Sequence, residues 1–115
     1  MELTTRQQGT VSILVIRGRI DQASADSFQQ ALAPSLTGCT KQGTSLVLDF
    51  SGVDYISSVG LRVLILAAKQ VKAQEGKIAI AALTPVVAEV FQISRFNLVF
   101  RVFAGVEEAI AVLGQ

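Results

Sequence analysis

Short apolar runs alternate with amphipathic segments along nearly the whole chain, and this alternation constrains the fold more than any other feature. Four apolar runs have the length and composition of strands: residues 10–18, 44–50, 77–83 and 98–103. Segments with helical spacing of apolar residues follow them: about 24–36, 59–74, 84 onward and 105–113. The polar residues 2–8 can add an edge strand. This alternation predicts an α/β fold with a mixed, mostly parallel sheet of about five strands and about four helices.

The ends of these elements carry capping and turn signals. Ser24 and Thr84 are the expected N-caps of the helices that follow them. SGVDY, residues 51–55, predicts a turn-rich exit from the preceding strand, and Gly76 is the expected C′ residue of the long second helix. Both alternating sets of strand positions are apolar. We therefore expect both faces of the sheet to be covered, by the chain's own helices or partly by a partner.

The composition fits one domain over residues 1–115 and excludes several classes of protein. Hydrophobic residues make up 50% of the chain and charged residues only 17%, so part of the apolar surface can meet a partner. The net charge of +1 gives no indication of binding to nucleic acid or to an anionic membrane. No apolar run is long enough to insert into a membrane, and the polar first residues do not resemble a signal peptide. We therefore expect a cytoplasmic protein.

The chemistry that the sequence lacks argues against an enzyme. The chain has no histidine, and its single cysteine, Cys39, excludes an intrachain disulfide or a Cys-pair metal site. It has no Walker loop and no Gly-x-Gly-x-x-Gly motif. We therefore expect no metal, no nucleotide and no other cofactor.

Two adjacent serines, Ser57 and Ser58, lie between a strand and the long second helix. One of them should be the N-cap of that helix, which contributes about 1 kcal/mol. A helix N-terminus also favours negative charge, so a phosphoryl group on either serine would be stabilised there. Both roles are compatible, because one hydroxyl can cap while the other is modified. Arg62 shares a helix face with Ser58, and Lys69 and Lys72 continue this face, which either faces solvent or meets a partner.

At these residues the chain resembles a known family. LDFSGVDYISSVGLRVL, residues 48–64, is similar to the signature of STAS domains, the anti-sigma factor antagonist family. GRID, residues 18–21, resembles the Gly-x-(Leu/Ile)-Asp of that family, and residues 83–110 resemble its C-terminal half. The resemblance therefore runs along nearly the whole chain and implies the STAS fold.

The resemblance also implies a partner switch. In that family the unphosphorylated antagonist binds a GHKL-type serine kinase that is also an anti-sigma factor, and phosphorylation by this kinase releases it. A metal-dependent phosphatase of the PP2C type resets the switch. The position that the family phosphorylates corresponds here to Ser58, ahead of Val59-Gly60-Leu61. Ser57, which stands where the family often has aspartate, is the alternative. Asp21 and Asp49 match acidic positions of the family.

We expect the docking face to consist of the loop 53–58 and the helix 59–74. The residues expected to bind the partner are Asp21, Asp54, Tyr55, Ile56, Ser57, Ser58, Val59, Gly60, Arg62 and Lys69.

Two other functions compete with this interpretation. STAS-like domains also occur in lipid-transport ATPase complexes and in anion transporters, and in an accessory subunit of that kind Ser58 would be only a helix cap. The other alternative is an enzyme with Ser58 as nucleophile. It lacks a histidine base, and Lys69 lies eleven residues further along the helix.

Overall fold

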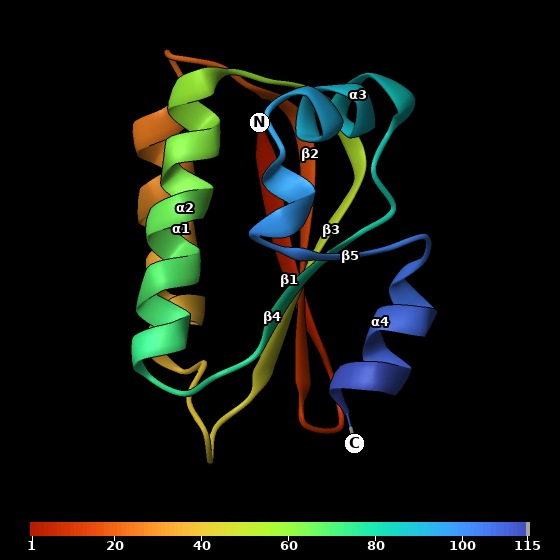
Figure 1. Ribbon diagram of the computed structural model, residues 1–115. Helices are drawn as coiled ribbons and strands as arrows, with labels where there is room; N and C mark the ends of the chain where they lie inside the picture. The colour runs from red at the N-terminus through yellow and green to blue at the C-terminus, as the bar shows by residue number, and fades with distance from the viewer. Residues whose placement is uncertain (115) are drawn as a thin grey trace.

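The strands form one mixed sheet in a computed structural model that describes residues 1–114. Its five strands lie in the order β1-β2-β3-β4-β5, with β1 antiparallel to β2 and every other neighbouring pair parallel (Figure 1). The strands are β1 (Glu2–Gln8), β2 (Val11–Ile20), β3 (Ser45–Ile56), β4 (Ile78–Ala81) and β5 (Arg101–Phe103). The α/β class and the edge strand expected from residues 2–8 are confirmed.

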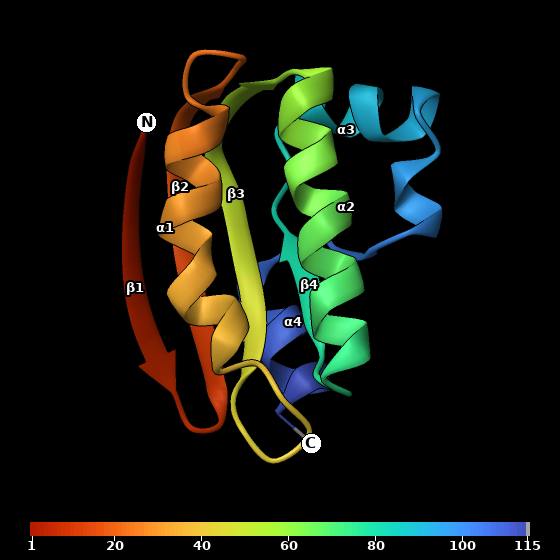
Figure 2. The ribbon, with the colours of Figure 1, turned by 90° about the vertical axis from the view of Figure 1, so that its left-hand side faces the viewer.

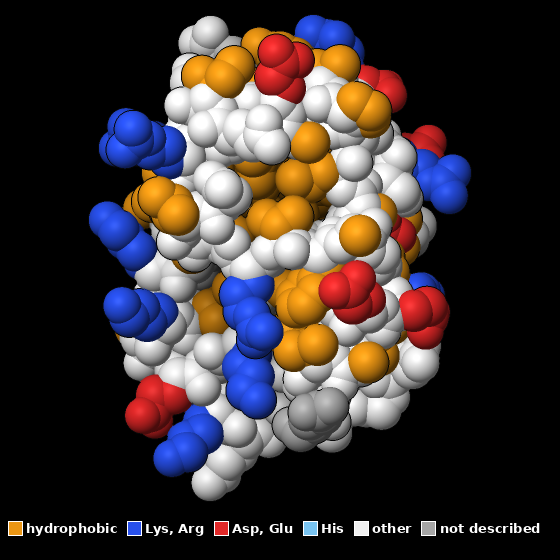
Figure 3. All heavy atoms as spheres, turned by 45° about the vertical axis from the view of Figure 1, so that its right-hand side comes forward, with side chains coloured by type: hydrophobic (Ala, Val, Ile, Leu, Met, Phe, Trp, Pro, Cys, Tyr) orange, Lys and Arg blue, Asp and Glu red, His pale blue; other side chains and the backbone are white. Residues whose placement is uncertain are grey.

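Four α-helices cover the two faces of this sheet unequally. They are α1 (Ala25–Thr37), α2 (Ser58–Ala73), α3 (Pro85–Ile93) and α4 (Val106–Leu113), with a short 3-10 helix η1 (Phe96–Leu98) before β5. Helices α1 and α2 lie side by side on one face (Figure 2). The eight-residue α4 lies on the other face, where hydrophobic side chains remain visible in a central hollow (Figure 3). No described helix is both long enough and apolar enough to cross a membrane.

Alternation along β3 explains why the core has two sides. Leu46, Leu48 and Phe50 are fully buried in the cluster under α1, α2 and α3. Val47, which points to the opposite face, is buried in the smaller cluster under α4. The strand is therefore apolar at both sets of positions because helices of the same chain cover it on both sides.

The expected turn at residues 51–55 is wrong, because β3 continues to Ile56. The pairing of β2 with β3 shifts register twice, so the twelve residues of β3 run alongside the ten of β2. Each shift leaves one extra residue on β3, as in a β-bulge. The small and polar residues of SGVDY therefore accommodate bulges in a continuous strand.

Two other boundaries differ from the sequence-based expectation. Residues 98–100 are not part of a strand, because Phe96 and Phe100 both turn inward and stack at 5.6 Å, so the chain forms η1 before β5 begins. At the end of α2 the left-handed residue is Glu75, with φ 59°, and not Gly76. Gly76 is needed for a different reason, since a Cβ there would lie 2.3 Å from the carbonyl oxygen of Cys39.

Candidate functional site

The two serines lie where α2 leaves the carboxyl ends of the parallel strands. The amide of Ser57 donates to the carbonyl of Ile20 at 2.8 Å, which joins the ends of β2 and β3. Ser58 is then the first residue of α2. Loops at this edge of a parallel sheet are a common place for binding sites, because the rigid strands position them.

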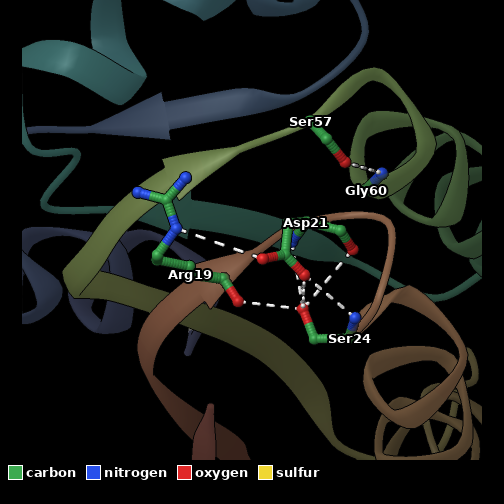
Figure 4. A network of polar contacts seen from close by, with 5 residues as sticks. All are labelled: Arg19, Asp21, Ser24, Ser57 and Gly60. Atoms are coloured by element: carbon green, nitrogen blue, oxygen red, sulfur yellow. Dashed lines mark hydrogen bonds and ion pairs between the residues drawn. The ribbon is translucent and has the colours of Figure 1, made fainter.

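Ser57 caps α2, and Ser58 does not. The Ser57 hydroxyl accepts a hydrogen bond from the Gly60 amide at 3.1 Å (Figure 4). The Ser57 carbonyl accepts one from the Leu61 amide at 2.9 Å. The side chain of Ser58 is exposed, and within residues 1–114 its hydroxyl makes no hydrogen bond. One hydroxyl therefore has a structural role, while the neighbouring hydroxyl is available for chemistry.

Gly60 allows α2 to begin this close to the sheet. A Cβ at residue 60 would lie 2.8 Å from Cγ2 of Ile20 and 2.9 Å from Cγ1 of Ile56. No larger residue fits without a shift of the helix start or of β2. Gly60 and Ile56 are both buried, so these two of the ten expected partner-binding residues shape the site from inside and do not form its surface.

Asp21 closes the neighbouring loop at the end of β2. Its carboxylate accepts a hydrogen bond from the Ser24 amide at 3.0 Å, while its own amide donates to the Ser24 hydroxyl at 3.0 Å (Figure 4). The carboxylate accepts a second hydrogen bond from the Ser24 hydroxyl at 3.1 Å. The two bonds that Ser24 donates to the carboxylate, assisted by the charge of Arg19, hold the pKa of Asp21 below its ordinary value. The carboxylate is thus ionised, and its hydrogen bonds hold the loop after β2. Ser24 is at the expected N-cap position of α1, although its side chain bonds to the Asp21 loop and not to the helix.

Arg19 is a member of this site that the sequence analysis missed. Its guanidinium lies over the ring of Tyr55 at 4.5 Å from the centroid, and its Nε is 4.0 Å from a carboxylate oxygen of Asp21. Arg19 therefore links the loop after β2 to the end of β3. Asp54, the residue without a partner at the second register shift, directly precedes Tyr55 and is exposed. Arg19 carries no local sequence signal, since it becomes a neighbour of Tyr55 only through strand pairing.

The exposed side of α2 is basic and partly apolar along its length. Arg62, Lys69 and Lys72 are all exposed, and the first turn of the helix has no acidic residue. On the same helix Val59 is 40% exposed and Leu66 is 46% exposed. An exposed strip of this kind is suited to contact with another protein that is apolar and acidic.

The start of α2 can also hold an anion. The first amides of a helix have no intrahelical acceptor, and Ser57 already satisfies those of Gly60 and Leu61. Among the described residues no acceptor is found for the amides of Ser58 and Val59, and the helix dipole adds partial positive charge. A phosphoryl group on Ser58 would therefore be electrostatically compatible with the fold. Asp49 lies further back, inside β3, where its carboxylate accepts from the Ser51 amide at 2.9 Å.

This fold and site define a small α/β regulatory domain that exposes the Ser58 hydroxyl at the start of a helix. The chain belongs to the STAS domain family, whose model matches residues 2–109. It is 37% identical over 111 residues to a Bordetella bronchiseptica protein provisionally named anti-sigma factor antagonist BtrV, covering 96% of this chain and 93% of that protein. It is 26% identical over 108 residues to the anti-sigma-F factor antagonist RsfB of Mycobacterium tuberculosis, covering 94% of this chain and 85% of that one.

A solved structure shows the same fold. The crystal structure of an anti-sigma factor antagonist from Mycobacterium paratuberculosis superposes with a TM-score of 0.87 at 20% identity, over 99% of this chain and 94% of the other. The STAS fold expected from the resemblance is confirmed.

Proposed function

We propose that this chain is an anti-sigma factor antagonist that is switched by phosphorylation of Ser58. The observation that carries the proposal is the division of roles at the start of α2. Ser57 caps the helix through the Gly60 amide, whereas the hydroxyl of Ser58 is exposed and unbonded within residues 1–114. Modification of Ser58 therefore changes the surface without removing an interaction on which the fold depends.

The proposed partner is an anti-sigma factor that is also a GHKL-type serine kinase. Such an enzyme brings its own ATP and magnesium, so this chain acts as its substrate and needs no cofactor or catalytic base. The names of the Bordetella and Mycobacterium relatives support an anti-sigma factor as the target. Neither of these two relatives is named as a transporter subunit. A PP2C-type phosphatase would restore the unmodified form. The proposed place of action is the bacterial cytoplasm, where sigma factors work.

The physical basis of release is desolvation of the new charge. A phosphoryl group adds close to two negative charges, and in a closed interface these charges must be paired or lose affinity. The exposed strip of Val59, Arg62, Leu66 and Lys69 favours a partner surface that is apolar and acidic. An acidic partner surface repels phosphorylated Ser58, so binding is lost while the fold of this chain remains unchanged.

The test is capture from a lysate of the source cell with four baits: wild type, Ser58→Ala, Ser58→Asp and Ser27→Asp. Ser27 is a matched control, because it is an exposed serine in the first turn of α1. We expect all baits except Ser58→Asp to capture a GHKL-type kinase, and mass spectrometry to find phosphate on Ser58 of the recovered wild type. If all four baits capture the same transporter subunits and no phosphate is found, Ser58 is only the first residue of a helix and the proposal is wrong.

A further inference from the structure

A groove lies at the opposite end of α2 from Ser58. It has a volume of about 790 Å³ and runs between the C-terminal half of α2, the start of β4 and the end of η1. This volume is within the range of small-molecule sites. Its apolar lining consists of Ile65, Ala68, Val71, Ile78, Leu98 and Val99.

One wall of the groove is formed by two exposed apolar side chains. Leu98 is 78% exposed and Val99 is 52% exposed, although Phe96 and Phe100 on either side of them are buried. Phe96 stacks on Phe100 at 5.6 Å and packs edge-on against Phe91 at 5.1 Å. This aromatic anchor holds Leu98 and Val99 outward, facing α2, so the wall does not depend on a mobile loop. Exposed apolar side chains that line a concave surface indicate a binding site.

The charges around the groove are mostly positive. Lys69 and Lys72 project from α2 and Lys77 precedes β4, while Glu75 is the only acidic residue among the lining residues. All four side chains are exposed. Their long side chains can place ammonium groups at the rim while the apolar floor remains open. A ligand that fits both features has an apolar body and an anionic end.

We propose that this groove binds a free single-chain amphiphile with an anionic head, of the fatty-acid class. The acyl chain would lie along Ile65, Ala68 and Ile78 against the wall of Leu98 and Val99. The carboxylate would lie at the basic end, near Lys72 and Lys77. The groove does not include Ser57, Ser58 or the Asp21 loop, and Lys69 is the one lining residue that it shares with the strip proposed to meet the anti-sigma factor.

The probe is dodecanoate, titrated below its micelle concentration into the full ¹⁵N-labelled chain and followed by NMR and calorimetry. We expect saturable binding of one dodecanoate, with the largest amide shifts at residues 65–78 and 98–99. Dodecanol, which has the same chain without the charge, should bind at least tenfold more weakly. Hexanoate, which has the charge with a shorter chain, should also bind at least tenfold more weakly.

Charge-reversal variants locate the site. Lys72→Glu/Lys77→Glu should weaken dodecanoate binding about tenfold or more, and added salt should weaken binding to the wild type. Arg6→Glu/Lys41→Glu is the matched control, since both residues are exposed and neither lines the groove; its affinity should be unchanged. Leu98→Ser should weaken binding without loss of the folded NMR spectrum, because Leu98 is already exposed.

Several results would overturn the proposal. They are absence of saturation, equal affinity for dodecanoate and dodecanol, shifts centred elsewhere, or no effect of Lys72→Glu/Lys77→Glu. Binding only to phosphatidylglycerol vesicles, with none to monomeric dodecanoate, would instead assign the patch to a membrane surface. Concentration-dependent shifts of the groove residues without ligand would show that a second copy of the chain occupies it.

Discussion

Ser57 and Gly60 are joined at the start of α2 by a hydrogen bond of 3.1 Å, from the Gly60 amide to the Ser57 hydroxyl. This bond assigns the structural role of the Ser-Ser pair to its first member. Ser58, one residue further on, is exposed. A change at the second serine therefore leaves the cap of the helix intact.

The first prediction concerns the stability of the two alanine variants. Ser57→Ala should lower the free energy of unfolding by about 1 kcal/mol, because a helix loses its N-cap. Ser58→Ala should change it by less than about 0.5 kcal/mol, as is usual for an exposed residue away from structural interactions. Urea unfolding followed by circular dichroism measures both values. The reverse order of the two losses would contradict the assignment of the cap to Ser57.

The second prediction concerns the close approach of α2 to β2. Gly60→Ala should destabilise the fold, because the new Cβ would lie 2.8 Å from Cγ2 of Ile20. Overpacking of this kind costs about 1–3 kcal/mol, which is opposed by a helix-propensity gain of about 1 kcal/mol. Gly38→Ala is the matched control, since the nearest atom to its Cβ is 4.0 Å away and its φ of −82° suits alanine. If both variants are equally stable, α2 does not pack as tightly as described.

The third prediction concerns the pH dependence of the Asp21 loop. The Ser24 hydrogen bonds favour the ionised carboxylate, so the pKa of Asp21 in the folded protein lies below its ordinary value of 3.8. Their stabilising contribution is complete above pH 3.8 and is lost as the pH falls through the lowered pKa. Titration of the Asp21 carboxyl carbon by NMR measures this value directly.

Variants of its two neighbours separate the causes of that shift. Ser24→Ala removes the hydroxyl and keeps the amide donor, so it should raise the midpoint of the Asp21 titration part of the way toward 3.8. Arg19→Gln should raise the midpoint less, because the Ser24 hydroxyl bond contributes more than the Arg19 charge. A wild-type midpoint at or above 3.8 would show that the carboxylate is not held by this loop.

The order of strands and helices could be predicted because its signals are local. The apolar run of β2, the helical spacing of Phe28 and Leu32 in α1, and the Thr84-Pro85 start of α3 all depend on residues close in sequence. The elements that these local patterns predict are present in the fold because the face that each pattern makes apolar is also the face that is buried.

The features that could not be predicted depend on contacts between distant segments. The bulges of β3 follow from its pairing with β2, so Ser51-Gly52 has the composition of a turn although it lies within a strand. Phe100 is of a residue type that favours strands, yet it packs against Phe96, and β5 begins only at Arg101. At the site, Arg19 joins Tyr55 and Asp21 only through strand pairing. The choice of Ser57 as the cap likewise depends on where α2 meets Ile20.

The central claim is that phosphate on Ser58 controls binding of the kinase that acts as anti-sigma factor. The most direct measurement is isothermal titration of that purified kinase with the unmodified chain and with the chain phosphorylated at Ser58, checked by mass spectrometry. We predict that phosphorylation weakens binding about a hundredfold, which corresponds to roughly 3 kcal/mol, while the circular dichroism spectrum of this chain stays the same. Equal affinity of the two forms would contradict the account.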